Sequence, residues 1–131
     1  MAIAVRNIQA ATQKYKQTLG VADIEYETVE SEGVRVAILH LDNCRIELME
    51  PIGETGPIAK FLQKRGEGLH HIALQTQDIQ SESDRMMELG TSFLGDIRPG
   101  SRGTQVTFIH PKSLHGVLAE LCSPPTQSDT K

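Results

Sequence analysis

Hydrophobic side chains near the start of the chain recur at the spacing of an α-helix. The apolar positions that would share one helical face are Ile8, Ala11, Tyr15 and Leu19. Gly20 follows them directly, and glycine is the residue that most often ends a helix. The pattern predicts an amphipathic helix over residues 8–19, preceded by a short apolar strand.

A second helix of the same kind is predicted in the other half of the chain. Asp78 is a favourable N-cap residue, because its side chain can accept a hydrogen bond from the free backbone N–H groups of the first turn. The positions expected to face inward are Ile79, Met86 and Leu89. Gly90 then ends the helical pattern.

Each predicted helix is followed by three runs of strand-forming residues with turn-forming residues between them. The runs are residues 24–30, 34–41 and 44–49 in the first half and 91–97, 104–110 and 116–122 in the second. The predicted order of elements is therefore βαβββ, repeated once. Neither half is large enough to form a good hydrophobic core alone, so the two halves are expected to associate.

The two halves also align residue by residue. When Ile8 is placed on Ile79, His71 falls on the position just before Met1, and Glu47 falls on Glu120. Each half thus offers one position for an imidazole at its start and one carboxylate near its end. Two such halves facing each other would bring four ligands to one point, which is the outline of a divalent-metal site.

The two carboxylates lie in the middle of predicted strands, where alternate residues point to opposite faces. Glu47 shares a face with Arg45 and Met49, whereas Ile46 and Leu48 would face the helix. Glu120 alternates with apolar neighbours in the same way. Because an unpaired buried charge is very costly, both carboxylates are expected to face a cleft or solvent.

The length of the chain and the distribution of its residues indicate how many domains it forms. The length of 131 residues fits one α+β domain over residues 1–124, with halves at about 1–53 and 69–124, and a polar, disordered tail over 125–131. The linker, residues 54–68, contains a short helical piece at 57–62.

Charge and hydropathy exclude two kinds of partner. The net charge of −4 argues against nucleic acid, which needs a basic surface. No apolar run is long enough to cross a bilayer. The two cysteines, Cys44 and Cys122, are too few and too far apart for a disulfide framework, so we expect a reducing compartment, the cytoplasm.

Several strings resemble the vicinal oxygen chelate (glyoxalase-like) superfamily and, within it, the methylmalonyl-CoA epimerase family. They are Ser31-Glu32-Gly33-Val34-Arg35-Val36-Ala37, Ile46-Glu47-Leu48-Met49-Glu50-Pro51, Pro57-Ile58-Ala59-Lys60-Phe61-Leu62, Lys64-Arg65-Gly66-Glu67-Gly68-Leu69-His70-His71-Ile72-Ala73, Phe108-Ile109-His110-Pro111-Lys112-Ser113 and Gly116-Val117-Leu118-Ala119-Glu120-Leu121. The resemblance implies two tandem βαβββ modules that form a single domain with a sheet-lined metal cleft.

The resemblance also implies a ligand set. His71, Glu120 and Glu47 would hold a divalent metal ion, Co²⁺ or similar, and Glu47 and Glu120 would be the acid–base pair. The family has a further histidine on its first strand, at the position before Met1. Either the true start lies upstream or this is a degenerate copy, and we expect the first, because the downstream sequence keeps the family pattern. Some relatives carry a glutamate as one of two bases where this chain has Val36.

The implied reaction is epimerisation of (R)- and (S)-methylmalonyl-CoA through a metal-stabilised enolate. Lys112 and Arg65 would lie near the coenzyme A end of this acyl-CoA substrate, and relatives commonly form dimers. Two alternatives remain. A lactoylglutathione lyase-like enzyme would share the ligands but usually reads Asp-Pro-Asp-Gly in place of His110-Pro111-Lys112-Ser113. A metal-free or inactive small-molecule binding module would account for the missing first-strand histidine.

Overall fold

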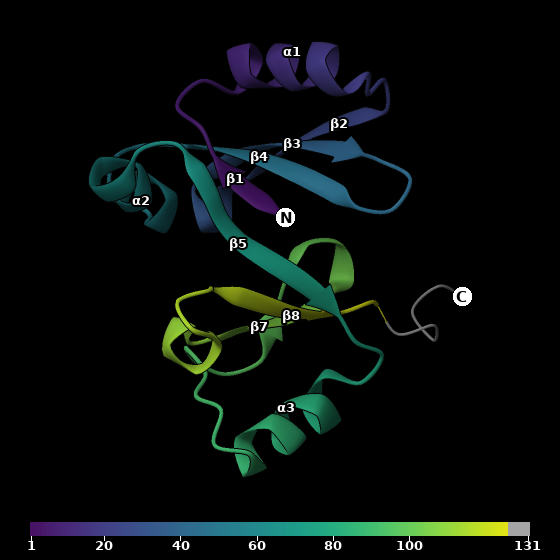
Figure 1. Cartoon of the computed structure of the whole chain (residues 1–131), viewed down its shortest axis with the longest axis vertical. Coiled ribbons are helices and arrows are strands. Elements are labelled where there is room, and N and C mark those ends of the chain that lie inside the picture. Colours follow the sequence, from purple (N-terminus) through teal and green to yellow (C-terminus); the bar gives the residue numbers. More distant parts are fainter. Residues whose placement is uncertain (126–131) are drawn as a thin grey trace. The chain divides into compact units, whose positions relative to one another are not determined.

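The computed structural model describes residues 1–125. The chain divides into two compact units: unit 1 is Met1–His70, and unit 2 begins at His71 (Figure 1). Except for Pro125, the predicted disordered tail lies outside the described residues. Within residues 1–125, no helix is both long and apolar enough to cross a membrane.

Unit 1 is a four-stranded sheet with two helices. Its elements are β1 (Ala2–Ala4), α1 (Ile8–Leu19), β2 (Ile24–Val29), a 3₁₀ turn (Glu30–Glu32), β3 (Val34–His40), β4 (Arg45–Pro51) and α2 (Pro57–Arg65). The strands lie in the order β2-β3-β4-β1, and β1 is parallel to β4 while the other two pairs are antiparallel. The predicted βαβββ order and the helix in the linker are confirmed.

Helix α1 begins and ends where the pattern predicted. The side chain of Asn7, its N-cap, accepts a hydrogen bond from the backbone N–H of Ala10 at 2.9 Å. Gly20 ends the helix in the left-handed conformation with φ of 67°, which glycine adopts without steric cost.

Each face of the unit 1 sheet carries an apolar cluster. On one face, α1 packs against alternate strand residues, and the buried cluster there is Val5, Ile8, Val21, Ala37, Leu39, Ile46 and Leu48. On the other face, α2 supplies Ile58 and Leu62, which pack with Ala4, Val34, Val36 and Ile38. Alternation along β3 and β4 thus provides a core on each side of one sheet.

Unit 2 repeats the same order of elements. They are β5 (Gly68–Gln75, which starts at the end of unit 1), α3 (Ile79–Glu88), β6 (Arg98–Pro99), β7 (Gln105–Ile109) and β8 (Ala119–Ser123), with 3₁₀ turns at Ser101–Gly103 and Pro111–Leu114. The strand order is β5-β8-β7-β6, and β5 is parallel to β8. The buried cluster under α3 is Ile79, Ile109, Ala119 and Leu121.

The start of α3 follows the prediction, whereas its end does not. Asp78 is the N-cap, and its carboxylate accepts a hydrogen bond from Ser81 N–H at 3.1 Å. Ile79 is buried and Met86 packs against the cluster, as expected. Leu89 was predicted to face inward but is 73% exposed, because the helix ends at Glu88 and Leu89 is the residue that caps it.

The strand predicted over residues 91–97 is also wrong. This segment makes one isolated bridge, between Phe93 and Ile109, and the strand that follows it, β6, has only two residues. Gly95 interrupts the segment with φ of 134°, outside the range of a regular strand. Pro99, which lacks a backbone N–H, limits the ladder that β6 can form. The apolar side chains of this segment do contribute to the core, because Phe93 and Ile97 pack under α3.

Candidate functional site

The two predicted carboxylates occupy equivalent positions in the two sheets. In unit 1, β1 and β4 pair with Ala2 opposite Glu47. In unit 2, β5 and β8 pair with Ala73 opposite Glu120. Both pairs of strands are parallel, so the repeat seen in the sequence is a repeat of strand register. His71 lies two residues before Ala73, and the position equivalent to His71 in the first half precedes Met1.

His71 and Glu120 lie on one face of the unit 2 sheet. Opposite residues in paired strands share a face, so Ala73 and Glu120 point the same way, and so does His71. Phe108 on β7 is the antiparallel partner of Glu120, and its ring meets the His71 ring edge-on, with centroids 5.3 Å apart. The intervening residues, Ala119 and Leu121, point to the other face and pack under α3.

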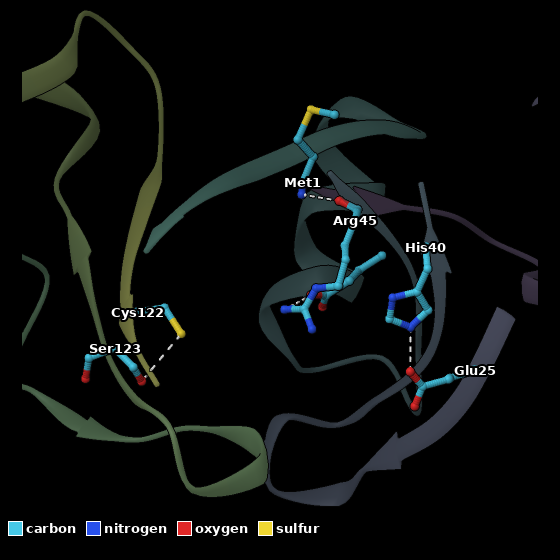
Figure 2. Close-up of polar contacts among 7 residues, drawn as sticks. Met1, Glu25, His40, Arg45, Cys122 and Ser123 are labelled. Carbon is cyan, nitrogen blue, oxygen red and sulfur yellow. Dashed lines mark hydrogen bonds and ion pairs between the residues drawn. The ribbon is translucent and has the colours of Figure 1, made fainter. Parts of the chain in front are cut away.

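Glu47 lies at the polar end of the unit 1 sheet. It pairs with Ile38 on β3, and its side chain is 30% exposed. Its carboxylate lies 3.8 Å from the Arg45 guanidinium. His40, the cross-strand partner of Arg45, forms a 2.5 Å contact with Glu25 (Figure 2). The same face therefore carries apolar residues near α2 and ionisable residues at the opposite ends of the strands.

The donor chemistry of His71 and Glu120 suits a divalent cation. An imidazole nitrogen and a carboxylate oxygen from adjacent parallel strands are two donors of the kind that zinc and cobalt accept. Glu47, the third predicted ligand, belongs to unit 1. Within residues 1–125, no group of three or more His, Cys, Asp or Glu side chains forms a metal-binding cluster. Unit 2 thus supplies two of the three predicted ligands, and the complete metal site stays a prediction.

Comparisons with known proteins give the family. The model of the glyoxalase/bleomycin resistance protein/dioxygenase superfamily matches residues 1–108. The chain is 41% identical to the ethylmalonyl-CoA/methylmalonyl-CoA epimerase of Cereibacter sphaeroides over 124 residues, which cover 92% of each protein. The chain belongs to the methylmalonyl-CoA epimerase family.

Solved structures agree with this assignment of the epimerase family. A hypothetical protein from Bacillus halodurans is 41% identical, with a TM-score of 0.91 and coverage of 96% of this chain and 92% of that one. A Streptomyces coelicolor methylmalonyl-CoA epimerase variant in complex with 2-nitronate-propionyl-CoA is 36% identical, with a TM-score of 0.87 and coverage of 95% and 94%. The predicted vicinal oxygen chelate fold and the predicted enzyme class, an isomerase, are confirmed at the level of the family.

Val36 and Arg65 occupy different environments in unit 1 of this epimerase-family chain. Val36 is 2% exposed and packs in the cluster beneath α2, so it contributes to the core. Arg65 is in the last turn of α2, where its guanidinium lies 5.8 Å from the centre of the Phe61 ring. His70 packs edge-on against the same ring at 5.0 Å. Burial, and then the nearby charge of Arg65, lower the pKa of His70, so the neutral imidazole is favoured.

The string His110-Pro111-Lys112-Ser113 forms a capped turn after β7. The Nδ1 atom of His110 accepts a hydrogen bond from the backbone N–H of Lys112 at 3.1 Å. The hydroxyl of Ser113 accepts one from the backbone N–H of Ser92 at 3.0 Å. Three residues of this family string therefore have local structural roles: His110 caps the turn, Pro111 starts it, and Ser113 attaches it to the segment after α3. The Lys112 side chain is left exposed.

Glu50 has a role that the sequence analysis missed. One carboxylate oxygen accepts a hydrogen bond from the backbone N–H of Ile8, in the first turn of α1, and the other forms an ion pair with Arg35 at 2.8 Å. Helix N-termini favour negative charge, so Glu50 holds α1 against the sheet. An available signal was its position on the helix-facing side of β4, two residues after Leu48, where a charge requires a partner.

Proposed function

We propose that this chain interconverts the two epimers of methylmalonyl-CoA. The observation that carries the proposal is the shared register of the two parallel strand pairs, which puts Glu47 and Glu120 at equivalent positions of a duplicated module. The family supports the choice of reaction, because named relatives act on ethylmalonyl-CoA and methylmalonyl-CoA. It also favours an epimerase over a lactoylglutathione lyase.

The reaction needs two proton transfers at one carbon. The carbon between the thioester and the carboxylate loses its proton to a base on one face, and the electron pair is delocalised onto the thioester oxygen. A proton is then delivered to the opposite face of the same carbon. One proton is removed and one is returned, so no other reactant is consumed. Glu47 and Glu120 are proposed as the pair, because each carboxylate can serve as base in one direction and as acid in the other.

His71, Glu120 and Glu47 are proposed to hold the divalent metal ion, Co²⁺ or a similar cation. A bound cation would supply Lewis-acid stabilisation of negative charge on the substrate oxygens. The edge-on contact with Phe108 restricts the orientation of the His71 ring, which favours its use as a ligand. Arg65 and Lys112 are proposed to contact the coenzyme A portion, because both carry exposed cationic side chains. We also propose a homodimer acting in the cytoplasm.

The test is exchange of the substrate's α-proton in deuterated water, followed by NMR, with Co²⁺ added to the purified chain. Wild-type protein should exchange the proton in a metal-dependent manner, and His71→Ala should abolish this exchange. His115→Asn is the matched control: it removes an exposed histidine from the same unit, at a left-handed position that asparagine tolerates.

Glu47→Gln sharpens the assignment of the two bases. With one base lost, one epimer should still exchange its α-proton through the remaining carboxylate, but inversion should stop. Circular dichroism of the acyl-CoA measures inversion, and NMR measures exchange. If the wild-type chain neither binds Co²⁺ nor exchanges the proton, the enzymatic proposal is wrong and a metal-free binding module takes its place.

A further inference from the structure

A cation–aromatic contact on unit 2 connects Arg98 with the candidate site. The guanidinium carbon of Arg98 lies 5.4 Å from the centre of the Phe108 ring. The same ring touches His71 at 5.3 Å and belongs to the cross-strand partner of Glu120. Phe108 therefore contacts both a predicted metal ligand and a guanidinium that comes from a different strand.

The sheet register places Arg98 on the same face as these residues. Arg98 on β6 pairs with Val106 on β7. Val106 lies two residues before Phe108, and residues two apart in a strand point the same way. Arg98, Phe108 and Glu120 consequently share the face opposite α3. This position does not depend on the arrangement of the two units, because all of these residues belong to unit 2.

The charge of Arg98 is not neutralised by a carboxylate among residues 1–125. Its side chain is exposed, and the contact it makes in this part of the chain is with the Phe108 ring. A guanidinium held over a ring by this cation–aromatic attraction keeps N–H donors for another partner. Two of those donors match the two oxygens of a carboxylate, which gives a directional, charge-assisted contact.

We propose that Arg98 binds the free carboxylate of a malonyl-type acyl thioester; this rests on the proposed function. The carboxylate is bonded directly to the carbon that loses its proton, so the group that recognises it must lie close to the acid–base carboxylate. Arg98 shares its face and its aromatic neighbour with Glu120 and His71. The phosphates of coenzyme A, by contrast, are separated from that carbon by the whole pantetheine arm. Arg98 thereby selects acyl groups that carry a free carboxylate in addition to the thioester.

The experiment measures dissociation constants by calorimetry for three ligands. Methylmalonyl-CoA carries both the carboxylate and the phosphates, propionyl-CoA lacks the carboxylate, and methylmalonyl-pantetheine lacks the phosphates. The variants are Arg98→Gln, Arg98→Lys and the matched control Arg85→Gln. Arg85 lies on α3, where it pairs with Glu82, on the other side of the unit 2 sheet. Thermal unfolding of each variant verifies that the fold is kept.

Arg98→Gln should weaken binding of methylmalonyl-CoA and methylmalonyl-pantetheine by about tenfold to a hundredfold, as for loss of a hydrogen bond to a charged group. Propionyl-CoA should bind the wild-type protein and the Arg98→Gln variant with almost equal affinity. Arg98→Lys should recover part of the loss, and Arg85→Gln should change nothing. Equal loss for the two CoA esters would assign Arg98 to a phosphate and overturn the proposal, as would no loss for any ligand. If the wild-type chain binds no methylmalonyl-CoA, the proposed function itself fails.

Discussion

The two units share an order of elements and a strand register, yet their sheets are used differently. In unit 1 an apolar cluster covers each face of the sheet, one under α1 and one under α2. In the described part of unit 2 there is one such cluster, under α3, and the opposite face carries His71, Phe108 and Glu120. The comparison shows that the same backbone pairing can carry different side chains on the second face of each sheet.

The helices are attached differently as well. The first turn of α1 is held by Glu50, which reaches from β4 to the backbone N–H of Ile8. The residue aligned with Glu50 in the second half is Ser123, which is too short for the same contact. At the start of α3, the side-chain acceptor is the local N-cap, Asp78. The start of α1 is therefore held by a long side chain from β4 as well as by its own cap, whereas the start of α3 has its local cap.

The largest expected difference is in the cost of truncating equivalent core leucines. Leu48 and Leu121 are aligned in the repeat, and both are nearly inaccessible, at 0% and 2% exposed. Leu48→Ala should lower the free energy of unfolding by about 4–5 kcal/mol, because the larger cluster around it cannot collapse into the cavity. Leu121→Ala should cost about 2–3 kcal/mol, because fewer buried residues surround it. Urea unfolding measures the loss of stability in both variants. Equal losses would contradict the difference between the two cores.

A smaller effect is expected from removing the attachment of α1. Glu50→Ala should lower the free energy of unfolding by about 1–3 kcal/mol, because the partly buried N–H of Ile8 loses its acceptor. Glu54→Ala is the control: it removes an exposed carboxylate three residues beyond the end of β4 and should change stability by less than about 0.5 kcal/mol. Urea unfolding measures both free energies, provided that the dependence of the free energy on urea concentration is the same for both variants. Equal values for the two variants would show that Glu50 does not hold the helix.

The smallest effect concerns two hydroxyls at aligned positions, Thr12 in α1 and Ser83 in α3. Each is 3% exposed, and neither has a hydrogen-bond partner among the described residues. Thr12→Val and Ser83→Ala should therefore be neutral or stabilising by up to about 1 kcal/mol, because no hydrogen bond is lost and a buried polar group is removed. Thermal unfolding measures both changes. Destabilisation of one variant alone would show that the helix–sheet contacts of the two units differ.

Local sequence signals predicted the helices well and the irregular strand poorly. Asp78 and Gly20 act at the ends of their own helices, so these residues and the periodicity were sufficient there. Residues 91–97 include strand-forming side chains, but the backbone of Gly95 turns away from the β region before a ladder can form. Leu89 fits a helical face only if the helix continues, and it does not. Residue propensities could not decide either case. The first depends on where the hydrogen-bonded pairing of strands stops, and the second on where the helix ends.

For the candidate site, the sequence by itself determined which residue types recur and on which strand face each one lies. That was enough to place Glu47 and Glu120 at equivalent positions, because the period of a strand and the register of a repeat are both contained in the order of residues. Only the tertiary structure decided that Phe108 touches His71 and that the Arg98 guanidinium lies over the same ring. These contacts join side chains from different strands, and the distance between them depends on how β7 pairs with its neighbours rather than on any local preference.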